Sequence, residues 1–446
     1  MSERPEPIQS KNKFTVDVFY MGITKIFLAI LKISMSVITA RFLGPAGRGV
    51  FFSFFQASGI TNTIFTISLG EGLIYNIGNG TIKQKNVFGT VIFLSLCFGL
   101  FISCILFLIL PILQAHFLNN VGMNILDLSY FIAPAMMFEY FSNSALRGLK
   151  LFTIANKISI SSRITVLVLS CFSLYFFEGS IYHLILWFGI ALLINCVVYA
   201  AALLKASNFK LFINYKNIPE TLRYSIRVHP AVLLTEIEYR ADIFILLFFL
   251  DAAAVGIYSI GVTVAQLIWY ASNSVNSIFF PHLASMHQGE AKNLFSARVI
   301  KFNFLINLFL IIILCLFGSF IINILYGELF SQSYFVLLIL APGLLSDSIG
   351  RNLATWLKGE GAPKILSVIS ILSLIFNIAL NFIFIPKYGL YGAALASAIT
   401  YFIRALALLK VYCKRTNLSI FSIVSWSKYD SAFLRSLFGR ALKKTS

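Results

Sequence analysis

The sequence predicts an all-α integral membrane protein with 12 transmembrane helices in two parallel six-helix lobes around a central cavity. Composition is the first reason: 59% of the 446 residues are hydrophobic and 12% are charged, whereas a soluble domain carries about 25% charged residues. The second reason is a series of apolar runs, each close to the roughly 20 residues that a helix needs to cross a bilayer. The third is an internal repeat that relates the two halves of the chain.

The apolar runs follow one another with mostly short connections. Each run is expected to be a helix, because a bilayer core tolerates only a backbone whose polar groups are bonded internally. The polar start, residues 1–13, lacks the three-part pattern of a cleavable signal peptide, so the first run is expected to remain as an anchor. The predicted spans are 18–40, 50–76, 88–112, 126–147, 158–177, 181–204, 230–250, 254–280, 300–325, 333–356, 365–385 and 390–411.

Successive connections between these spans alternate between many basic residues and few. If the N-terminus is cytoplasmic, 26 Lys and Arg residues lie on the cytoplasmic side, and only Arg41, Arg48 and Lys387 lie outside. Cytoplasmic loops are enriched in Lys and Arg, so both termini are predicted to be cytoplasmic. Orientation thus accounts for most of the formal net charge of +18, and no nucleic-acid partner is expected.

The repeat has an offset of 208 residues. It aligns residues 131–134 with 339–342, and with one residue of slip it aligns 43–51 with 250–258. Lys32 falls opposite Arg240 at the same offset. Because each half has an even number of predicted spans, both halves enter the membrane from the same side, which is typical of transporters built from parallel repeats.

The repeat divides the chain into four predicted segments. Residues 1–207 form the N-lobe with spans 1–6, and residues 208–222 form a cytoplasmic inter-lobe loop. Residues 223–412 form the C-lobe with spans 7–12, and residues 413–446 form a cytoplasmic tail. Within the tail, residues 421–442 have the spacing of a basic amphipathic helix at the membrane surface; a frayed tail is the alternative.

Six basic residues fall inside the predicted spans. A charge at the centre of a span costs about 2.5–3.5 kcal/mol, so such residues usually face a cavity or a partner. Lys25 and Lys32 have no acidic neighbour in their own helix. We therefore predict a cationic substrate cavity. Its residues are Lys25, Lys32, Arg240, Arg351 and Arg404. For Arg163, the sixth, and for Arg404, extension of the side chain to the membrane interface is an alternative.

Acidic residues also fall inside the spans. Glu236 and Arg240, like Asp347 and Arg351, are spaced four apart and could be structural pairs within one helix. Alternatively, carboxylates that are partly buried can bind a coupling H+ or Na+. The candidates for this role are Glu139, Glu236, Asp242 and Asp347. A cationic cavity suits an anionic substrate such as a pyrophosphate, whereas a cavity for organic cations would be acidic.

The sequence lacks common catalytic and cofactor-binding motifs. The sequence has no P-loop, no zinc-binding HExxH motif and no dinucleotide-binding glycine motif. Its six cysteines lie in or beside apolar runs, with no metal-binding spacing. We therefore expect no enzyme activity, no metal and no cofactor.

Three segments resemble the Wzx-type O-antigen/polysaccharide flippase family, a branch of the multidrug/oligosaccharidyl-lipid/polysaccharide (MOP) exporter superfamily. They are Arg41-Phe42-Leu43-Gly44-Pro45-Ala46-Gly47-Arg48-Gly49-Val50-Phe51, then Arg240-Ala241-Asp242-Ile243-Phe244 with Val255-Gly256-Ile257-Tyr258, and Ile385-Pro386-Lys387-Tyr388-Gly389-Leu390-Tyr391-Gly392-Ala393-Ala394. The resemblance extends from the first span to the twelfth.

This resemblance implies a flippase of the bacterial cytoplasmic (inner) membrane. Such a protein moves undecaprenyl-pyrophosphate-linked polysaccharide repeat units across the membrane by alternating access. It also implies a lipid-linked oligosaccharide as the substrate, and a polysaccharide polymerase and a chain-length regulator as partners. A multidrug/cation antiporter of the MATE type is the alternative within the superfamily.

Overall fold

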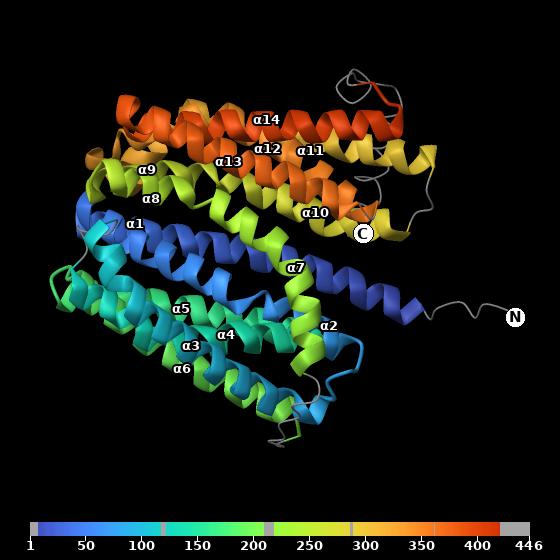
Figure 1. Ribbon diagram of the computed structural model, residues 1–446, viewed down its shortest axis with the longest axis horizontal. Coiled ribbons are helices and arrows are strands. Elements are labelled where there is room, and N and C mark those ends of the chain that lie inside the picture. Colours follow the sequence, from blue (N-terminus) through green and yellow to red (C-terminus); the bar gives the residue numbers. More distant parts are fainter. Residues whose placement is uncertain (1–7, 117–121, 209–217, 286–288, 361, 420–446) are drawn as a thin grey trace, which may run out of the picture.

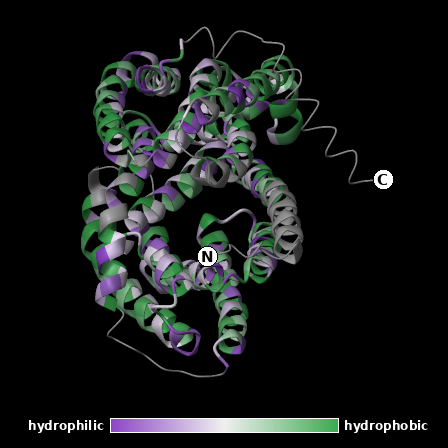
Figure 2. Ribbon diagram, turned by 90° about the vertical axis from the view of Figure 1, so that its right-hand side faces the viewer, coloured by the Kyte–Doolittle hydropathy of each residue, from purple (hydrophilic) through white to green (hydrophobic). Residues whose placement is uncertain are grey.

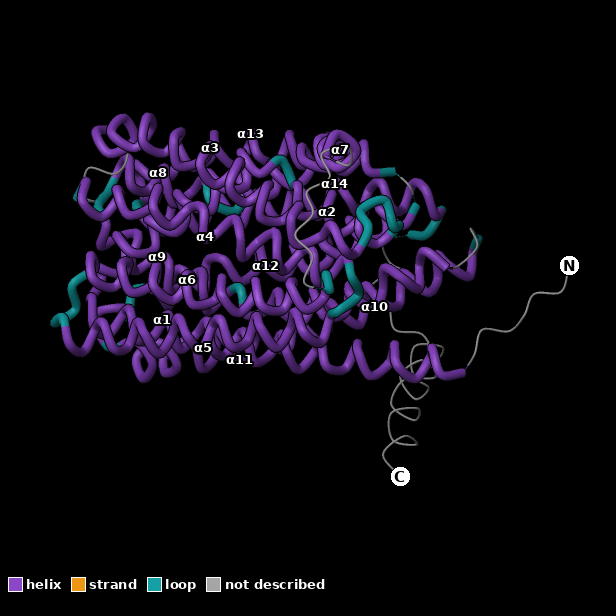
Figure 3. Tube along the Cα trace, turned by 90° about the horizontal axis from the view of Figure 1, so that it is seen from below, coloured by secondary structure: helices purple, strands orange, loops and turns teal. Residues whose placement is uncertain are grey.

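The computed structural model describes residues 8–116, 122–208, 218–285, 289–360 and 362–419. All regular structure in these residues is helical, and short loops join the helices (Figure 3). Most helices follow the long axis of the molecule (Figure 1). In chain order they are α1 (Ile8–Thr66), α2 (Leu69–Gly78), η1 (Gln84–Asn86), α3 (Val87–His116), α4 (Met123–Gly148), α5 (Phe152–Phe176), α6 (Ile181–Ala206), α7 (Ile218–Glu238), α8 (Ala241–Phe249), α9 (Ala252–Ala265), α10 (Leu267–Ser285), α11 (Glu290–Tyr326), η3 (Glu328–Phe330), α12 (Ser333–Gly359), α13 (Pro363–Tyr388) and α14 (Leu390–Thr416).

The helices confirm the predicted fold class, an all-α integral membrane protein. Within the described residues, nine helical stretches are long and apolar enough to cross a membrane. Large apolar side chains are exposed along several of them, such as Phe107 (63% exposed) and Leu316 (71%), as expected for surfaces that contact lipid. Seen along the long axis, hydrophobic colour predominates on most helices (Figure 2). The number of twelve spans stays a prediction, because one stretch, 27–66, overlaps parts of the first two predicted spans and α4 is not among the nine.

Helix α1 folds back on itself at Gly44. A straight helix of 40 residues would be about 60 Å long, twice the hydrocarbon thickness of about 30 Å. Gly44 has φ 65° and ψ −175°, a conformation that glycine adopts easily, and Pro45 suits the first position of the second arm. Arg48 in the second arm donates a 2.8 Å hydrogen bond to Thr39 Oγ1 in the first. The first two predicted spans are therefore a hairpin with almost no loop.

Three predicted spans are interrupted, which the sequence analysis did not anticipate. The span 50–76 breaks at Ile67 and Ser68, which have φ 49° and 52°. The span 230–250 breaks between α7 and α8, and the span 254–280 breaks between α9 and α10. Hydropathy does not reveal such breaks, because broken helices persist in membranes wherever other protein groups satisfy the freed backbone atoms.

Helices α1–α6 and α8–α14 gather in separate halves, and α7 crosses between them (Figure 1). The halves touch where α1 meets α9. We call this the distal end; α9 begins and α11 ends there, and it is remote from the start of α1 and the end of α14 (Figure 1).

At the distal end α1 and α9 approach closely. A Cβ on Gly49 would lie 1.6 Å from Ala252 O, and one on Gly256 would lie 2.0 Å from Pro45 O. With the one-residue slip of the repeat, Pro45 corresponds to Ala252 and Gly49 corresponds to Gly256. The contact is therefore reciprocal, as a two-fold relation between the halves requires.

The start of α7 packs on the first half of the chain. Tyr224 stacks on Tyr75 of α2 with 4.3 Å between ring centroids, and Asn76 Nδ2 donates to Thr221 Oγ1 at 3.3 Å. The predicted segment boundaries stay a prediction. The amphipathic helix predicted for residues 421–442 lies outside the described residues.

Candidate functional site

Two arginines of the second half lie in a network of carboxylates. Arg404 Nη1 lies 2.6 Å from Glu238 Oε2, and its Nη2 bonds Asp347 Oδ1. Arg351 Nε donates to Asp347 Oδ2 at 2.7 Å. Arg404 is 8% exposed and Asp347 is 1% exposed, so Arg404 does not extend to the membrane interface. Two carboxylates thus neutralise two guanidinium groups inside the protein.

Aromatic rings complete this network. Arg351 Nη2 donates to Tyr239 OH at 2.6 Å, and Arg351 Cζ lies 3.9 Å from the ring centroid of Trp269. Arg404 Cζ lies 5.3 Å from the ring of Tyr401. Such cation–π contacts stabilise a cation that has lost its water. The arrangement therefore stabilises the second half and leaves both arginines little capacity to bind a substrate.

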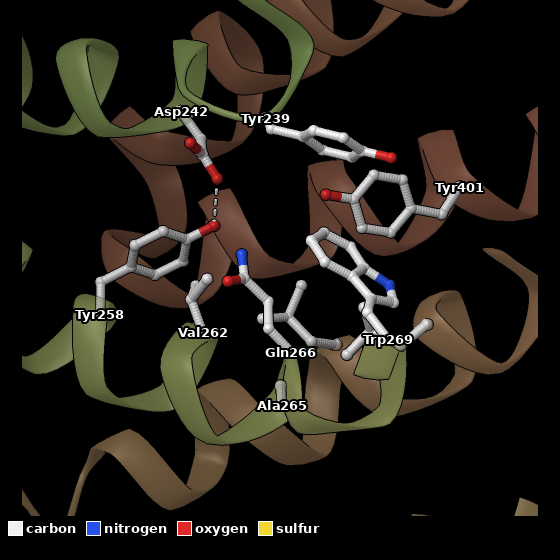
Figure 4. Close-up of a pocket in the computed structure, with 10 residues that line it drawn as sticks. Tyr239, Asp242, Tyr258, Val262, Ala265, Gln266, Trp269 and Tyr401 are labelled. Carbon is white, nitrogen blue, oxygen red and sulfur yellow. Dashed lines mark hydrogen bonds between the residues drawn. The ribbon is translucent and has the colours of Figure 1, made fainter. Parts of the chain in front are cut away.

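A small pocket lies beside the network, with Tyr239, Trp269 and Tyr401 on one side and Asp242 and Tyr258 on the other (Figure 4). Its free space, about 10 Å³, has room for about one water molecule. Asp242 is 6% exposed; it accepts hydrogen bonds from Tyr258 OH and, at 2.9 Å, from the Ile243 main-chain N–H. These hydrogen bonds hold the carboxyl group of Asp242 in place.

Arg240 carries a partner of its own. Its Nη2 lies 2.6 Å from Glu236 Oε2, so both predicted pairs of residues four apart are formed. Arg240 also reaches the first half of the chain, since a Cβ on Gly59 would come within 1.8 Å of Arg240 Nη1. Arg240 is therefore at the junction of the halves, as expected for a cavity residue, but its charge is compensated.

Three other cations gather without a carboxylate. Lys32 lies in the first arm of α1, Arg48 in its second arm and Arg163 in α5. Lys32 interacts electrostatically with both arginines. Among the described residues, none of the three has a carboxylate partner. We call them the cationic cluster.

Hydroxyl groups surround the cationic cluster. Arg48 is 5% exposed and donates to Thr39 Oγ1 and Ser36 Oγ at 2.8 and 3.2 Å. Ser36 lies one turn beyond Lys32 on the same face of α1. Tyr326 of α11 donates to Ser36 Oγ at 3.4 Å. Lys32 and Arg163 are exposed, so the cluster combines accessible cations with a buried one.

The sequence analysis missed two members of the cationic cluster. It placed Arg48 in an outer connection, but the turn at Gly44 returns this side chain to the bundle; the Gly44-Pro45 pair was the available signal. It left open whether Arg163 lines the cavity or extends to the membrane interface. The structure puts Arg163 near Lys32 and near Tyr270 of α10. Lys25 lies in α1, and its side chain is outside the described residues.

Glu139 has the simplest surroundings of the candidate acids. Its Oε1 accepts a 2.9 Å hydrogen bond from Ser162 Oγ, and Ser162 accepts one of 2.8 Å from Asn195 Nδ2. These residues belong to α4, α5 and α6. Within the described residues no cation pairs with Glu139.

Solved structures share this architecture. The structure titled lipid II flippase MurJ in an inward closed conformation superposes with a TM-score of 0.73, at 18% sequence identity over 91% of this chain and 89% of that one. An inward-facing multidrug resistance MATE family transporter of the MOP superfamily gives a TM-score of 0.72, at 16% identity over 89% and 98% of the two chains. At these identities the likeness shows the fold alone.

Curated relatives are similar in sequence. A Shigella flexneri protein named as an O-antigen transporter is 24% identical over 84% of this chain and 92% of its own length. The capsular polysaccharide biosynthesis protein CapF of Staphylococcus aureus is 29% identical over 33% of this chain. The matches cover 39% of CapF and 62% of an uncharacterized membrane protein of Methanocaldococcus jannaschii, to which the chain is 24% identical.

The sequence profile described as polysaccharide biosynthesis protein matches residues 38–334, more than half of the chain. The matched part includes Arg48 and Arg163 of the cationic cluster, and it includes Glu139 and Arg240. With the shared fold and the relatives above, this match identifies the chain as a member of the polysaccharide biosynthesis protein family.

Proposed function

We propose that the chain is a lipid-linked oligosaccharide flippase, which moves undecaprenyl-pyrophosphate-linked polysaccharide repeat units across the cytoplasmic membrane by alternating access. Membership of the polysaccharide biosynthesis protein family supports this function. The names of the relatives, an O-antigen transporter and a capsular polysaccharide biosynthesis protein, support it too. The fold shared with a lipid II flippase is consistent with it.

The cationic cluster is the observation that carries the proposal. Lys32, Arg48 and Arg163 concentrate positive charge among membrane helices without a compensating carboxylate. Holding such charges together is costly, and a bound pyrophosphate would offset that cost with charge-assisted hydrogen bonds from guanidinium and ammonium groups. The Ser36 and Thr39 hydroxyls, which already position Arg48, would orient its guanidinium group.

The other predicted cations have a smaller part in this proposal. Arg240 is at the junction of the halves, where a substrate could compete with Glu236 for its guanidinium group. Arg351 and Arg404 are neutralised by Asp347 and Glu238, and we assign them a structural role. Lys25 stays a predicted cavity residue.

A multidrug/cation antiporter is the second candidate. The pocket beside Asp242 favours it, because aromatic rings and a carboxylate are the groups that bind cations. However, this pocket holds about one water molecule, which is too small for an organic cation. The exposed cations Lys32 and Arg163 would also repel one.

We further propose the cellular setting that this function implies. The chain would be a multi-pass protein of the bacterial inner membrane with both termini in the cytoplasm. It would act with a polysaccharide polymerase and a chain-length regulator, and ion coupling by H+ or Na+ would drive the cycle. We propose no enzyme activity and no cofactor.

Complementation tests the function. A strain lacking this gene would receive Lys32→Ala, Arg163→Ala or the double variant, and surface polysaccharide would be measured at matched membrane levels of protein. We expect the double variant to lose most of the polymer. Lys157→Ala is the matched control, since it removes an exposed cation from the same helix as Arg163. Normal polymer from the double variant would contradict the proposal, and drug sensitivity of the deletion strain with normal polymer would favour the antiporter.

A further inference from the structure

Comparison of the two halves distinguishes Glu139 from the other acids. At the offset of 208, Glu139 corresponds to Asp347. The two cationic partners of Asp347, Arg351 and Arg404, correspond to Asn143 and Cys196. The remaining acid of that network, Glu238, corresponds to Ile30. At these four positions the second half has two acids and two bases. The first half has a single acid and no base.

Contacts support this correspondence. Cys196 lies near Glu139 and interacts with it electrostatically. In the other half, the corresponding residue Arg404 forms an ion pair with Asp347. Asn143 is one turn beyond Glu139, as Arg351 is one turn beyond Asp347, but its amide donates elsewhere, to Ser159 and Tyr199. Glu139 thus keeps the position of Asp347 in the fold and lacks its counter-charges.

The difference in counter-charge sets what each carboxyl group can do. Protonating Asp347 would leave Arg351 and Arg404 without their shared partner, and uncompensated buried charges are strongly destabilising. Protonating Glu139 uncovers no cation. Its hydrogen bond with Ser162 survives, because a carboxylic acid can donate to a hydroxyl oxygen and a carboxylate can accept from the hydroxyl. Glu139 can therefore change charge without disrupting the fold.

We propose that Glu139 is the proton-coupling group of this transporter. The inference rests on the proposed transport function and names its coupling residue. The Glu139 carboxylate binds a proton from water on one side of the membrane and becomes a carboxylic acid. It then returns that proton to water on the other side, so one proton crosses per cycle and no other bond is made or broken.

The surroundings of Glu139 favour a proton over a metal ion. Hard cations such as Na+ or Ca²⁺ are held by several oxygen ligands, whereas the chain from Asn195 to Ser162 to Glu139 runs through donors that point toward the carboxylate. In the part of the chain that the structure describes, no group of three or more His, Cys, Asp or Glu side chains could hold a metal.

The other titratable groups near Glu139 are Cys196 and Tyr199 on α6. A thiol and a phenol are ordinarily neutral at physiological pH. Arg147 belongs to the same helix and is separated from Glu139 by Asn143, to which its Nε donates at 2.8 Å. In the described part of the chain, Glu139 therefore has neutral titratable neighbours and no paired cation.

Helix α5 links the proposed proton site to the cationic cluster. Ser162, which bonds Glu139, directly precedes Arg163 of the cluster. Protonation reverses the direction of the Ser162–Glu139 hydrogen bond. The proton site and one member of the cationic cluster therefore share a helix.

Transport into liposomes tests the proposal. Purified chain would be reconstituted with fluorescent undecaprenyl pyrophosphate, and its distribution between leaflets would be followed under an imposed pH gradient. For one proton per probe, the distribution can shift up to about tenfold per pH unit. We expect Glu139→Gln to move the probe without any shift, and Glu328→Gln, an exposed distal acid, to behave like the wild type. A gradient-dependent shift in Glu139→Gln would overturn the proposal.

A second readout needs no transport. Infrared difference spectra between acidic and neutral samples should show a protonated carboxyl band in the wild type that Glu139→Gln lacks and Glu328→Gln keeps. If the wild type does not move the probe but this band disappears in Glu139→Gln, the proposed flippase function is wrong and the proton site is supported. If the band is the same in both, the proton site falls.

Discussion

Basic side chains of the same formal charge differ in this protein in whether a carboxylate lies beside them. Arg404 touches two carboxylates, whereas Lys32 and Arg163 touch none among the described residues. Removing one partner of a buried ion pair leaves an uncompensated charge and costs about 3–5 kcal/mol. Removing an uncompensated cation relieves repulsion. The two kinds of residue should therefore affect stability and transport in opposite ways.

Arg404→Leu should lower the free energy of unfolding by about 3–5 kcal/mol, because Glu238 and Asp347 would lose their shared partner. Thermal unfolding in detergent measures this effect. Adding Glu238→Gln should restore part of the loss, since the unpaired Glu238 carboxylate disappears while Asp347 keeps its ion pair with Arg351. Lys32→Ala is the contrasting variant, and its unfolding temperature should not fall. Equal stability of Arg404→Leu and the wild type would show that the network is not structural.

At the level of helices, the break after α1 depends on the second half of the chain. In a continuous helix the Ile64 carbonyl would accept from the Ser68 N–H; left-handed Ile67 and Ser68 prevent this. The His229 ring of α7 bonds the Ile64 main chain on one side of the break and Ser68 Oγ, at 3.2 Å, on the other. A left-handed β-branched residue is strained, so the His229 ring stabilises a costly conformation.

A double-mutant cycle tests this contact. Ser68→Ala and His229→Ala should each destabilise the protein, and their effects should be non-additive by about 0.5–1.5 kcal/mol, the net worth of one hydrogen bond. The readout is unfolding temperature in detergent. His229→Ala combined with Thr90→Ala, whose hydroxyl bonds Asn86 O in a different helix, should be additive. Additivity of the Ser68 pair would mean that His229 does not hold the break.

The contact between α1 and α9 leaves no room for a side chain. Gly49→Ala and Gly256→Ala should each cost about 1–3 kcal/mol, the usual range for overpacking, because each new Cβ would overlap a main-chain carbonyl. The two costs should be similar, since the contact is reciprocal. Gly78→Ala, whose Cβ would meet its nearest atom at 3.9 Å, should be neutral. A harmless Gly49→Ala would mean that the halves are not in close contact at this end.

For the whole molecule, sequence patterns predicted the elements better than their partners. Hydropathy located the long apolar helices, because crossing a bilayer requires a long apolar run, but it did not show the breaks within three predicted spans. It could not show that Arg404 meets Glu238, 166 residues away, since partners on different helices follow from three-dimensional packing. The sequence placed five cations in the cavity; it offered the pair of Arg351 with Asp347 within one helix but not the contacts of Arg404 with Asp347 and Glu238.

The repeat was predictive for geometry and not for chemistry. It anticipated a two-fold relation, and the reciprocal contacts of Gly49 and Gly256 agree with it. Charges, however, have diverged between the halves, with a neutral network around Asp347 and a lone acid at Glu139. Symmetric backbone contacts allow the halves to move as matching bodies, whereas asymmetric charges allow one half to bind ions and the other to remain rigid.

Arg41 fastens the two halves at the distal end. Its Nε donates to Leu325 O at 2.7 Å, and its Nη2 donates to Ile324 O. These carbonyls end α11, where backbone acceptors lack helical partners and carry partial negative charge. In the predicted topology the distal end faces outward, and alternating access requires that this connection open in every cycle.

Cross-linking tests that requirement. In a variant whose six native cysteines are replaced, Arg41→Cys and Leu325→Cys would be joined by a bifunctional maleimide of about the length of an arginine side chain. We expect the link to stop movement of fluorescent undecaprenyl pyrophosphate in liposomes, because the distal end can no longer open. The same pair without reagent, and each single cysteine with reagent, should remain active. Undiminished transport in the linked protein would show that the substrate crosses without separation of the halves at Arg41, and alternating access would have to be abandoned for this chain.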